Sequence, residues 1–212
     1  LNSHGKLDYG MSTRWGLTDK NDPLRTEATA LPRKANARLA VNSGDPGRPD
    51  GKANARVGAP CATAQSEHIL ARVAAGHPRW RFGCKGVSGA FRKGETDERG
   101  PVIRPPRTWP DNPSFLPGSL ARVKKVVFGL STAPRLRCLK VIKEAKLLGL
   151  EPARSDPASL VFHDRSKKKR GPYTLLGLLC IRVDDNPWTG GHDMSEQMDK
   201  LGAKVGFGDG RA

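Results

Sequence analysis

Cysteine pairs, long apolar runs and aromatic residues are all scarce in this 212-residue chain. It has four cysteines: Cys61, Cys84, Cys138 and Cys180. None belongs to a C-x-x-C pair and no apolar leader precedes them, which argues against a zinc site or a disulfide framework and predicts reduced, structural thiols. The longest apolar stretch, residues 175–181, is far shorter than the roughly 20 residues that span a membrane. We therefore expect a soluble protein with no membrane partner.

Acidic residues are also few relative to basic ones. The chain has 21 Asp and Glu against 37 Lys and Arg, which gives a net charge of +16 and a pI of about 10.2. Such an excess favours polyanionic partners, because phosphates that bind basic side chains release their counterions. Nucleic acid is the expected partner, and from charge alone an anionic membrane surface ranks second among polyanions. A charge that only keeps the chain soluble, or that reflects base composition, is the alternative.

Hydrophobic residues make up 36% of the chain and aromatic residues 6%, while 24 glycines and 17 prolines are present. This composition allows a folded core but a thin one. Residues 1–62 show no sustained period of 2 or 3.6 and are predicted to be mostly loop.

Regular structure is expected beyond residue 62. A helix is predicted from Ser66, as its N-cap, to Gly76. A second helix is predicted after Pro134, because apolar residues recur there at helical spacing. That expected apolar face consists of Leu136, Leu139, Ile142, Ala145 and Leu148. Strands are predicted over residues 80–84, 160–163 and 175–183, and an acidic turn follows the last of them.

The paired carboxylates Asp184 and Asp185 in that turn carry the clearest chemistry. Two adjacent acids at the end of an apolar strand can share divalent metal ions, which could then align a nucleotidyl transfer. Alone the pair is weak support for catalysis, because Asp-Asp before Asn186 and Pro187 is also common in turns that have no catalytic role.

Residues 124–135 read K-K-V-V-F-G-L-S-T-A-P-R and resemble the segment K-K-x-x-Y-G-L-x-x-A-P-R of copia-type retrotransposon reverse transcriptases. Other segments similar to the family follow its order. They are residues 14–20, 34–39, 87–91, 94–95, 155–157, 183–185 and 189–190. The set covers roughly residues 12–208, so coincidence explains it poorly. By this resemblance the chain is identified as a degenerate member of that family.

The resemblance implies an α+β fold, with the fingers and palm of a right-handed polymerase. Residues 1–62 would be a loop-rich, fingers-like segment, and residues 63–212 a palm-like core truncated before the thumb. The 27 residues that follow Asp185 leave no room for the family's thumb and ribonuclease H regions, so we expect an internal slice of a polyprotein.

The resemblance also implies site residues and partners. Asp184 and Asp185 would hold Mg²⁺, Arg38 would reach the nucleotide triphosphate, and Phe91 would be the steric gate against ribose. Phe128 and Gly129 belong to the segment that would contact template and nucleotide. The implied partners are an RNA template, a DNA primer and deoxynucleotide triphosphates. Alternatively, Arg38 is one solvated cation among others and Phe91 fills the core; the basic residues 167–170 are expected to be a solvated loop.

The chain departs from the family at the position of a third metal-binding acid, where it has Gly86. Lys85 beside it is expected to add positive charge where the metals would sit, so we expect the chain to be inactive. Three other departures are expected to disturb packing or pairing: Arg182 for a tyrosine, Pro187 in the returning strand, and Arg137 for an apolar aromatic.

Two hypotheses from other classes remain beside the enzyme fragment. The first is a non-enzymatic basic protein that binds RNA or DNA through phosphate contacts without sequence preference. The second is a translated relic without a selected function.

Overall fold

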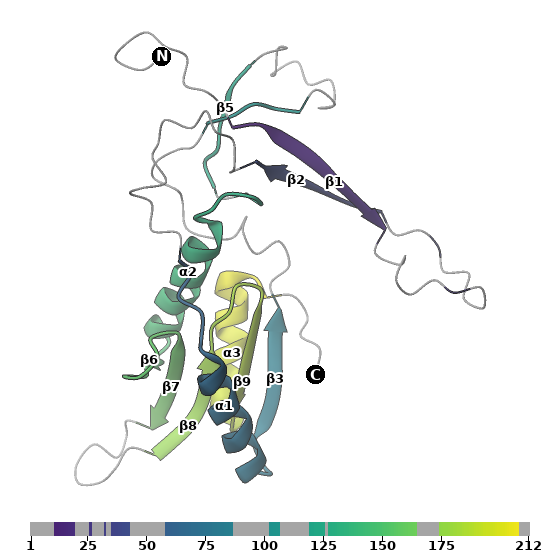
Figure 1. The fold of residues 1–212 in the computed structure, drawn as a ribbon. Coiled ribbons are helices and arrows are strands. Elements are labelled where there is room, and N and C mark those ends of the chain that lie inside the picture. The colour runs from purple at the N-terminus through teal and green to yellow at the C-terminus, as the bar shows by residue number, and fades with distance from the viewer. Residues whose placement is uncertain are drawn as a thin grey trace, which may run out of the picture. The chain divides into compact units, whose positions relative to one another are not determined.

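The structure is a computed structural model that describes residues 11–19, 26, 32, 35–42, 58–86, 102–106, 119–125, 127–164 and 174–207. Within these residues the protein is a mixture of helices and antiparallel sheets (Figure 1), which confirms the predicted fold class at that level. It forms two compact units, residues 1–55 with 96–133 and residues 56–95 with 134–212. The predicted division had a single boundary at residue 62. The observed one differs, because segment 96–133 groups with the N-terminal residues.

The first unit contains two small antiparallel sheets. Strands β1 (Thr13–Asp19) and β2 (Ala35–Val41) pair over their whole length, with Gly16 opposite Arg38. Strands β4 (Val102–Ile103) and β5 (Ala121–Arg122) form the other sheet. The expectation that residues 1–62 are mostly loop missed β1 and β2, whose backbone hydrogen bonds come from mutual pairing rather than from any local apolar period.

The second unit is built on one five-stranded sheet with the strand order β3-β9-β8-β7-β6, in which all neighbours are antiparallel. The strands are β3 (Arg81–Gly86), β6 (Glu151–Pro152), β7 (Ser159–Asp164), β8 (Thr174–Cys180) and β9 (Asp185–Gly190). The helices are α1 (Ala64–Gly76), α2 (Ala133–Leu147) and α3 (His192–Val205).

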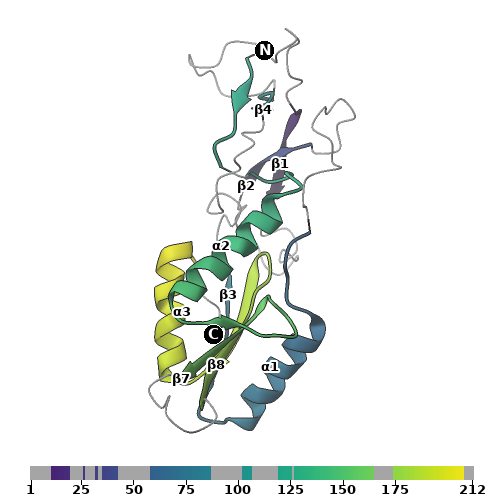
Figure 2. The same ribbon diagram turned by 90° about the vertical axis from the view of Figure 1, so that its left-hand side faces the viewer.

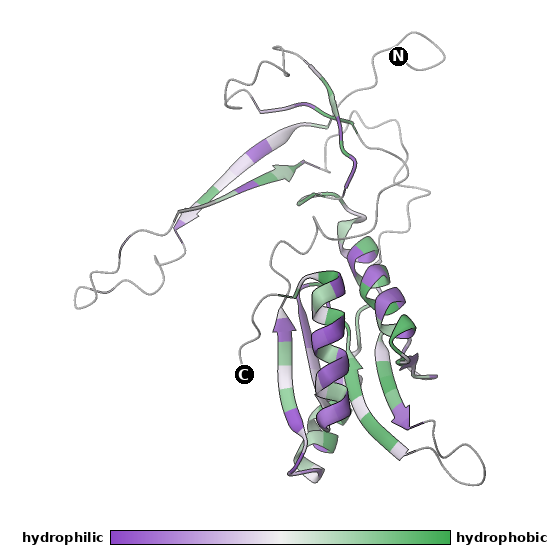
Figure 3. Ribbon diagram, turned by 180° about the vertical axis from the view of Figure 1, so that it is seen from behind, coloured by the Kyte–Doolittle hydropathy of each residue, from purple (hydrophilic) through white to green (hydrophobic). Residues whose placement is uncertain are grey.

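Helices α1 and α3 cover opposite faces of the sheet (Figure 2). The central strand β8 is hydrophobic along almost its whole length (Figure 3) because both of its faces are covered.

The N-cap of helix α1 lies three residues before the predicted cap Ser66. Thr63 is the N-cap, and its hydroxyl oxygen accepts a hydrogen bond from the Ser66 backbone N–H at 3.2 Å. Ser66 and Leu70 are buried, whereas Ile69 is half exposed. The helix was therefore predicted correctly, but its first turn was not.

Helix α2 buries only part of the predicted face, namely Ile142 and Ala145, together with Cys138 and Val141 beside it. Cys138, Val141 and Ala145 have no exposed surface, while Leu139 is 37% exposed. Leu136 and Leu148 are half-buried, so the predicted leucines lie at the margin of the buried face.

Helix α3 was not predicted, although its sequence carries a clear signal. Met194, Met198, Leu201 and Val205 recur at helical spacing and are at most 1% exposed. Gly206 ends the helix in the left-handed conformation, with φ of 71°. A Cβ on Gly177 would lie 2.8 Å from the Cβ of Met194, so the bare backbone of β8 is what allows α3 to pack this closely.

None of the helices in the described part of the chain combines the length and apolar character needed to cross a membrane.

Candidate functional site

The acidic pair lies at the bend between β8 and β9. Strand β8 ends at Cys180 and β9 begins at Asp185, and both Asp184 and Asp185 are exposed. The buried side chain of Asn186 fixes this bend: its Oδ1 accepts from the Arg182 backbone N–H, and its Nδ2 donates to the Lys85 carbonyl oxygen, both at 3.2 Å. Asn186 therefore joins the turn to β3, a role that sequence reasoning assigned only to general turn chemistry.

Gly86 is the direct partner of Asp185 in the pairing of β3 with β9. A Cβ at Gly86 would lie 3.4 Å from Asp185 Oδ1, an ordinary contact distance, so a side chain fits there without rearrangement. The position that holds an acid in the resembling family is thus adjacent to the acidic pair. In this chain it contributes no ligand.

A two-metal site needs several carboxylates that converge on the same ions. Among the residues that the structure describes, no group of three or more His, Cys, Asp or Glu side chains is arranged to hold a metal ion. Asp184 and Asp185 alone present two exposed acids on one bend.

Lys85 does not place its charge beside Asp185, contrary to expectation. Its Nζ lies 3.3 Å from Asp199 Oδ1 of helix α3. Neighbouring residues in a strand point to opposite faces. The Lys85 side chain therefore lies on the face opposite the one to which a side chain at position 86 would point.

Cys84 lies on the same face of β3 as Gly86, two residues earlier. Burial raises the pKa of its thiol, the negative charge of Asp185 raises it further, and a backbone hydrogen bond from Asn186 acts in the opposite direction. The effect of Asp185 shows that this carboxylate has a thiol within electrostatic reach. Sequence reasoning had treated Cys84 only as a structural residue.

Of the expected disturbances, that of Arg182 is absent from the second unit and that of Pro187 affects only one side of its strand. Arg182 is exposed and its Nη1 lies 3.0 Å from Oε1 of Glu67 in helix α1, so it forms an ion pair instead of disturbing the core. Strand β9 continues through Pro187. Pro187 pairs with Cys84 of β3, but the pairing of β8 with β9 stops at Trp188, so the hairpin ladder ends next to the proline, as expected.

The third expected disturbance is confirmed. Arg137 has no exposed surface, and Nε, Nη1 and Nη2 of its guanidinium have no hydrogen-bond partner among the described residues. Burial lowers the pKa of Arg137 to about 10, against opposing effects of Cys138 and Asp184. A buried, unpaired cation of this kind weakens the fold near the acidic bend.

Three of the four predicted nucleotide-binding residues come together in the first unit. The Arg38 guanidinium carbon lies 5.3 Å from the centre of the Phe128 ring, a cation–π geometry. Gly129 has φ of +88°, and a Cβ there would overlap the carbonyl oxygen of Val41. The Val41 N–H donates to the Phe128 carbonyl oxygen at 2.8 Å, which joins β2 to this segment. Phe91 and residues 167–170 lie outside the described residues.

Comparisons of the chain with protein-family models, with curated protein sequences and with solved structures found no match.

Proposed function

We propose that the chain is a fragment of a copia-type retrotransposon reverse transcriptase whose acidic site is incomplete and which no longer extends a primer. The observation that carries the proposal is the register of β3 and β9, which pairs Gly86 with Asp185. In the resembling family an aspartate at that position joins the acidic pair. This register therefore supports both the ancestry and the loss of activity.

The connectivity around the acids supports the same proposal. The acidic bend joins the antiparallel strands β8 and β9, and α2 precedes this hairpin in the chain while α3 follows it. An ion pair of 3.6 Å between Glu144 of α2 and Lys204 of α3 connects the two helices. A helix-supported hairpin with acids at its bend suits a palm-like core. In the first unit, the cation–π contact joins Arg38 to Phe128, and these two residues belong to two of the resembling segments.

Restoring the missing acid tests the site. Gly86→Asp should create a site for Mn²⁺ that isothermal titration calorimetry detects, because the new carboxylate would lie beside Asp185. Gly76→Asp is the matched control, since it adds the same charge at a glycine with nothing within 4 Å of a Cβ. Adding Asp185→Asn to Gly86→Asp should remove the binding. Equal Mn²⁺ binding by the Gly86→Asp and Gly76→Asp variants would contradict the proposed site.

Primer extension tests the lost activity. With an RNA template, a DNA primer and all four deoxynucleotide triphosphates, the natural sequence should give no product. Product from Gly86→Asp, lost again with Asp185→Asn, would support the polymerase ancestry. Extension by the natural sequence would overturn the proposed inactivity.

A further inference from the structure

The connection from α1 to β3 places aromatic rings at the surface of the second unit. The rings of His77 and Trp80 are stacked, with centroids 4.3 Å apart and an interplanar angle of 16°. Trp80 is held in place against the start of α3, since its Nε1 lies 3.9 Å from where a Cβ on Gly191 would be. Two residues later Phe82 is 59% exposed, although large apolar side chains of the same sheet are buried. Single exposed apolar residues are common on protein surfaces, so Phe82 supports a binding surface only together with the stacked rings of His77 and Trp80 that precede it in the chain.

Basic residues surround these rings and acidic ones are missing from the same segment. The sequence from His68 to Gly86 contains four Lys or Arg and no Asp or Glu. Arg79 and Arg81 alternate with Trp80 and Phe82 in the sequence, and both arginines are exposed. Arg81 and Phe82 are neighbours in β3, so their side chains point to opposite faces of the sheet at this edge strand. Neither forms an ion pair with any residue in the described part of the chain, whereas Lys85 is already engaged by Asp199. The two guanidinium groups are thus available to an external anion.

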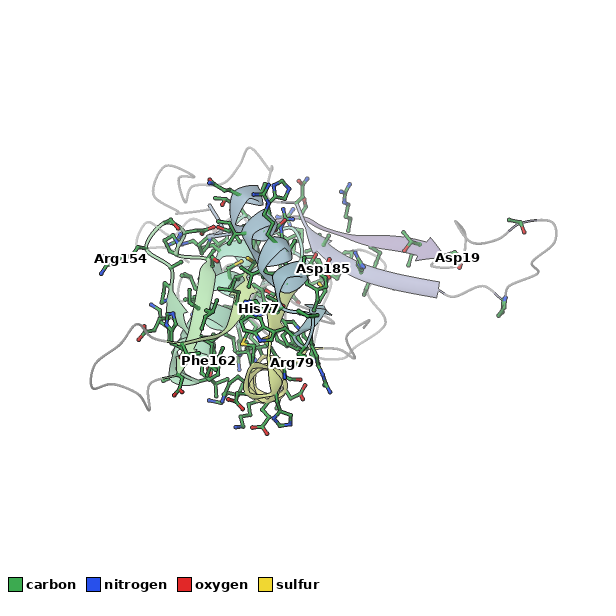
Figure 4. All side chains as sticks on the ribbon, turned by 90° about the horizontal axis from the view of Figure 1, so that it is seen from below. Asp19, His77, Arg79, Arg154, Phe162 and Asp185 are labelled. Carbon is green, nitrogen blue, oxygen red and sulfur yellow. The ribbon has the colours of Figure 1, made fainter. Side chains whose placement is uncertain are left out.

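The position of the segment separates it from the acidic bend. Strand β3 is at the edge of its sheet, and Arg81 pairs with Gly190 while Gly86 pairs with Asp185. The five residue-to-residue steps from Arg81 to Gly86 span roughly 17 Å at about 3.3 Å per residue. Figure 4 looks at the end of the sheet where His77 and Arg79 lie, at the end of α1.

We propose that His77, Trp80 and Phe82, together with Arg79 and Arg81, form a binding surface for single-stranded nucleic acid. Exposed rings offer stacking faces to unpaired bases, and the two guanidinium groups beside the same edge strand can bind phosphates of that nucleic-acid strand. A duplex keeps its bases stacked inside and exposes its phosphates, so it can contact the two arginines of this surface but cannot stack on the aromatic rings. The surface is independent of the acidic bend and needs no metal ion.

Fluorescence anisotropy of the full chain with labelled oligo(dT) of about 15 nucleotides tests the stacking faces. Phe82→Ala and Trp80→Ala should each weaken binding by about 5- to 150-fold, while Phe82→Tyr, which keeps a ring, should bind like the natural sequence. Leu147→Ala is the control, because it removes another exposed apolar side chain (68%) from the same unit. Phe82 is a surface residue, so its variants keep the test valid even where Trp80→Ala weakens the fold.

The arginines are tested by the salt dependence of the same binding. Arg79→Gln and Arg81→Gln should each lower the log-log slope of affinity against salt by about 0.7. Arg154→Gln is the matched control, since Arg154 is exposed and follows β6 at the other edge of the sheet (Figure 4). It should leave the slope unchanged.

Three outcomes would overturn the surface. One is unchanged affinity for oligo(dT) in both Phe82→Ala and Trp80→Ala; another is an equal loss of duplex binding in these variants. The third is a dimer in sedimentation velocity that Phe82→Ala dissociates, which would assign the rings to a second copy of the chain. The Gly86→Asp variant should bind oligo(dT) like the natural sequence, so failure of the acidic site and failure of this surface are distinguishable.

Discussion

The carboxylate of Asp156 accepts a 2.6 Å hydrogen bond from the hydroxyl of Ser66, which lies 90 residues earlier in the chain. The same Oδ2 accepts from the Thr63 backbone N–H at 2.8 Å and from the Thr63 hydroxyl at 3.2 Å, and Oδ1 accepts from the Ala158 N–H at 3.0 Å. One buried acid therefore joins the start of α1 to the turn between β6 and β7. The short resembling segment 155–157 has this structural role in the protein.

The Asp156 contacts predict a pH-dependent contribution to stability. Burial alone would raise the pKa of Asp156, but the four hydrogen bonds outweigh it and hold the pKa below its ordinary value. The stabilisation is therefore fully present above about pH 4, the ordinary pKa of an unfolded aspartate, and is lost as the pH falls through the lower pKa of the folded state.

Asp156→Asn should lower the free energy of unfolding by about 1.5–3 kcal/mol at pH 7, because it removes a charged acceptor from a buried network. Urea denaturation at pH 7 and at acidic pH measures the effect, and the difference between the two proteins should shrink as the pH falls. Asp193→Asn, at an exposed acid in the first turn of α3, should cost less than about 1 kcal/mol. A difference for Asp156→Asn that does not change with pH would count against the charged network.

Replacing Arg137 with methionine should stabilise the second unit. The guanidinium is fully buried without a hydrogen-bond partner among the described residues, and a methionine of similar length fills the same space without that penalty. We expect an increase of about 1–3 kcal/mol, measured by urea denaturation.

The matched control for Arg137 is Arg135→Met in the same helix. Arg135 Nη1 donates to the Gly58 carbonyl oxygen at 3.1 Å, so this variant should gain nothing and lose up to about 1 kcal/mol. Destabilisation by Arg137→Met would show that the guanidinium makes a favourable contact.

Gly190→Ala should destabilise the protein by about 1–3 kcal/mol through overpacking. A Cβ at Gly190 would overlap the Met194 side chain and lie 2.7 Å from the Leu176 carbonyl oxygen. Gly76→Ala is the control in a helix end, where nothing lies within 4 Å, and should be neutral or stabilising by up to about 1 kcal/mol. Thermal unfolding followed by circular dichroism measures both; similar melting temperatures for the two variants would contradict the packing of α3 on this strand.

The cysteines should differ in their reactivity in the folded protein. Burial raises the pKa of Cys138 to about 12 and that of Cys180 to about 11, so neither supplies much thiolate near neutral pH. Iodoacetamide labelling followed by mass spectrometry should leave both unmodified at pH 8, and all four cysteines should react in concentrated guanidinium chloride. Rapid native labelling of Cys138 or Cys180 would refute the burial.

Cys84 gives a separate measurement of the acidic bend. After burial, the negative charge of Asp185 is the next cause that raises the pKa of this thiol. Asp185→Asn should therefore increase the rate of Cys84 alkylation near neutral pH, whereas Asp193→Asn should not change it. Equal rates in the two variants would mean that Asp185 lies too far from the thiol to act on it.

Local patterns predicted those parts of the fold that depend on neighbours in the sequence. The helices α1 and α2 and the apolar strands β7 and β8 follow from periodicity, and the acidic bend follows from turn-forming residues after an apolar strand. The burial of Arg137 without a partner was also expected, because the resembling family has an apolar aromatic residue at this position. Helix α3 obeys the same rules, and its methionine spacing would have predicted it.

Other features depend on partners that are distant in the sequence. Strands β1 and β2 form through pairing with each other, and no apolar period identifies either strand alone. The position of the Thr63 cap depends on its hydrogen bond to the carboxylate of Asp156, which lies 93 residues away in the sequence. The direction of Lys85 toward Asp199, and the ion pair of Arg182 with Glu67, likewise follow from the assembled sheet and helices. The number of charged residues in a segment does not predict which partner each charged side chain has in the folded protein.

The left-handed conformation of Gly129 requires glycine whatever the segment binds, because any other residue would collide with the backbone of β2. Folding alone therefore preserves the centre of the string that resembles the polymerase family. A copy that has stopped synthesising nucleic acid would retain this glycine for as long as its first unit folds. Conservation of this segment among related elements would consequently record inheritance of a backbone shape, and activity would have to be judged at Gly86 instead.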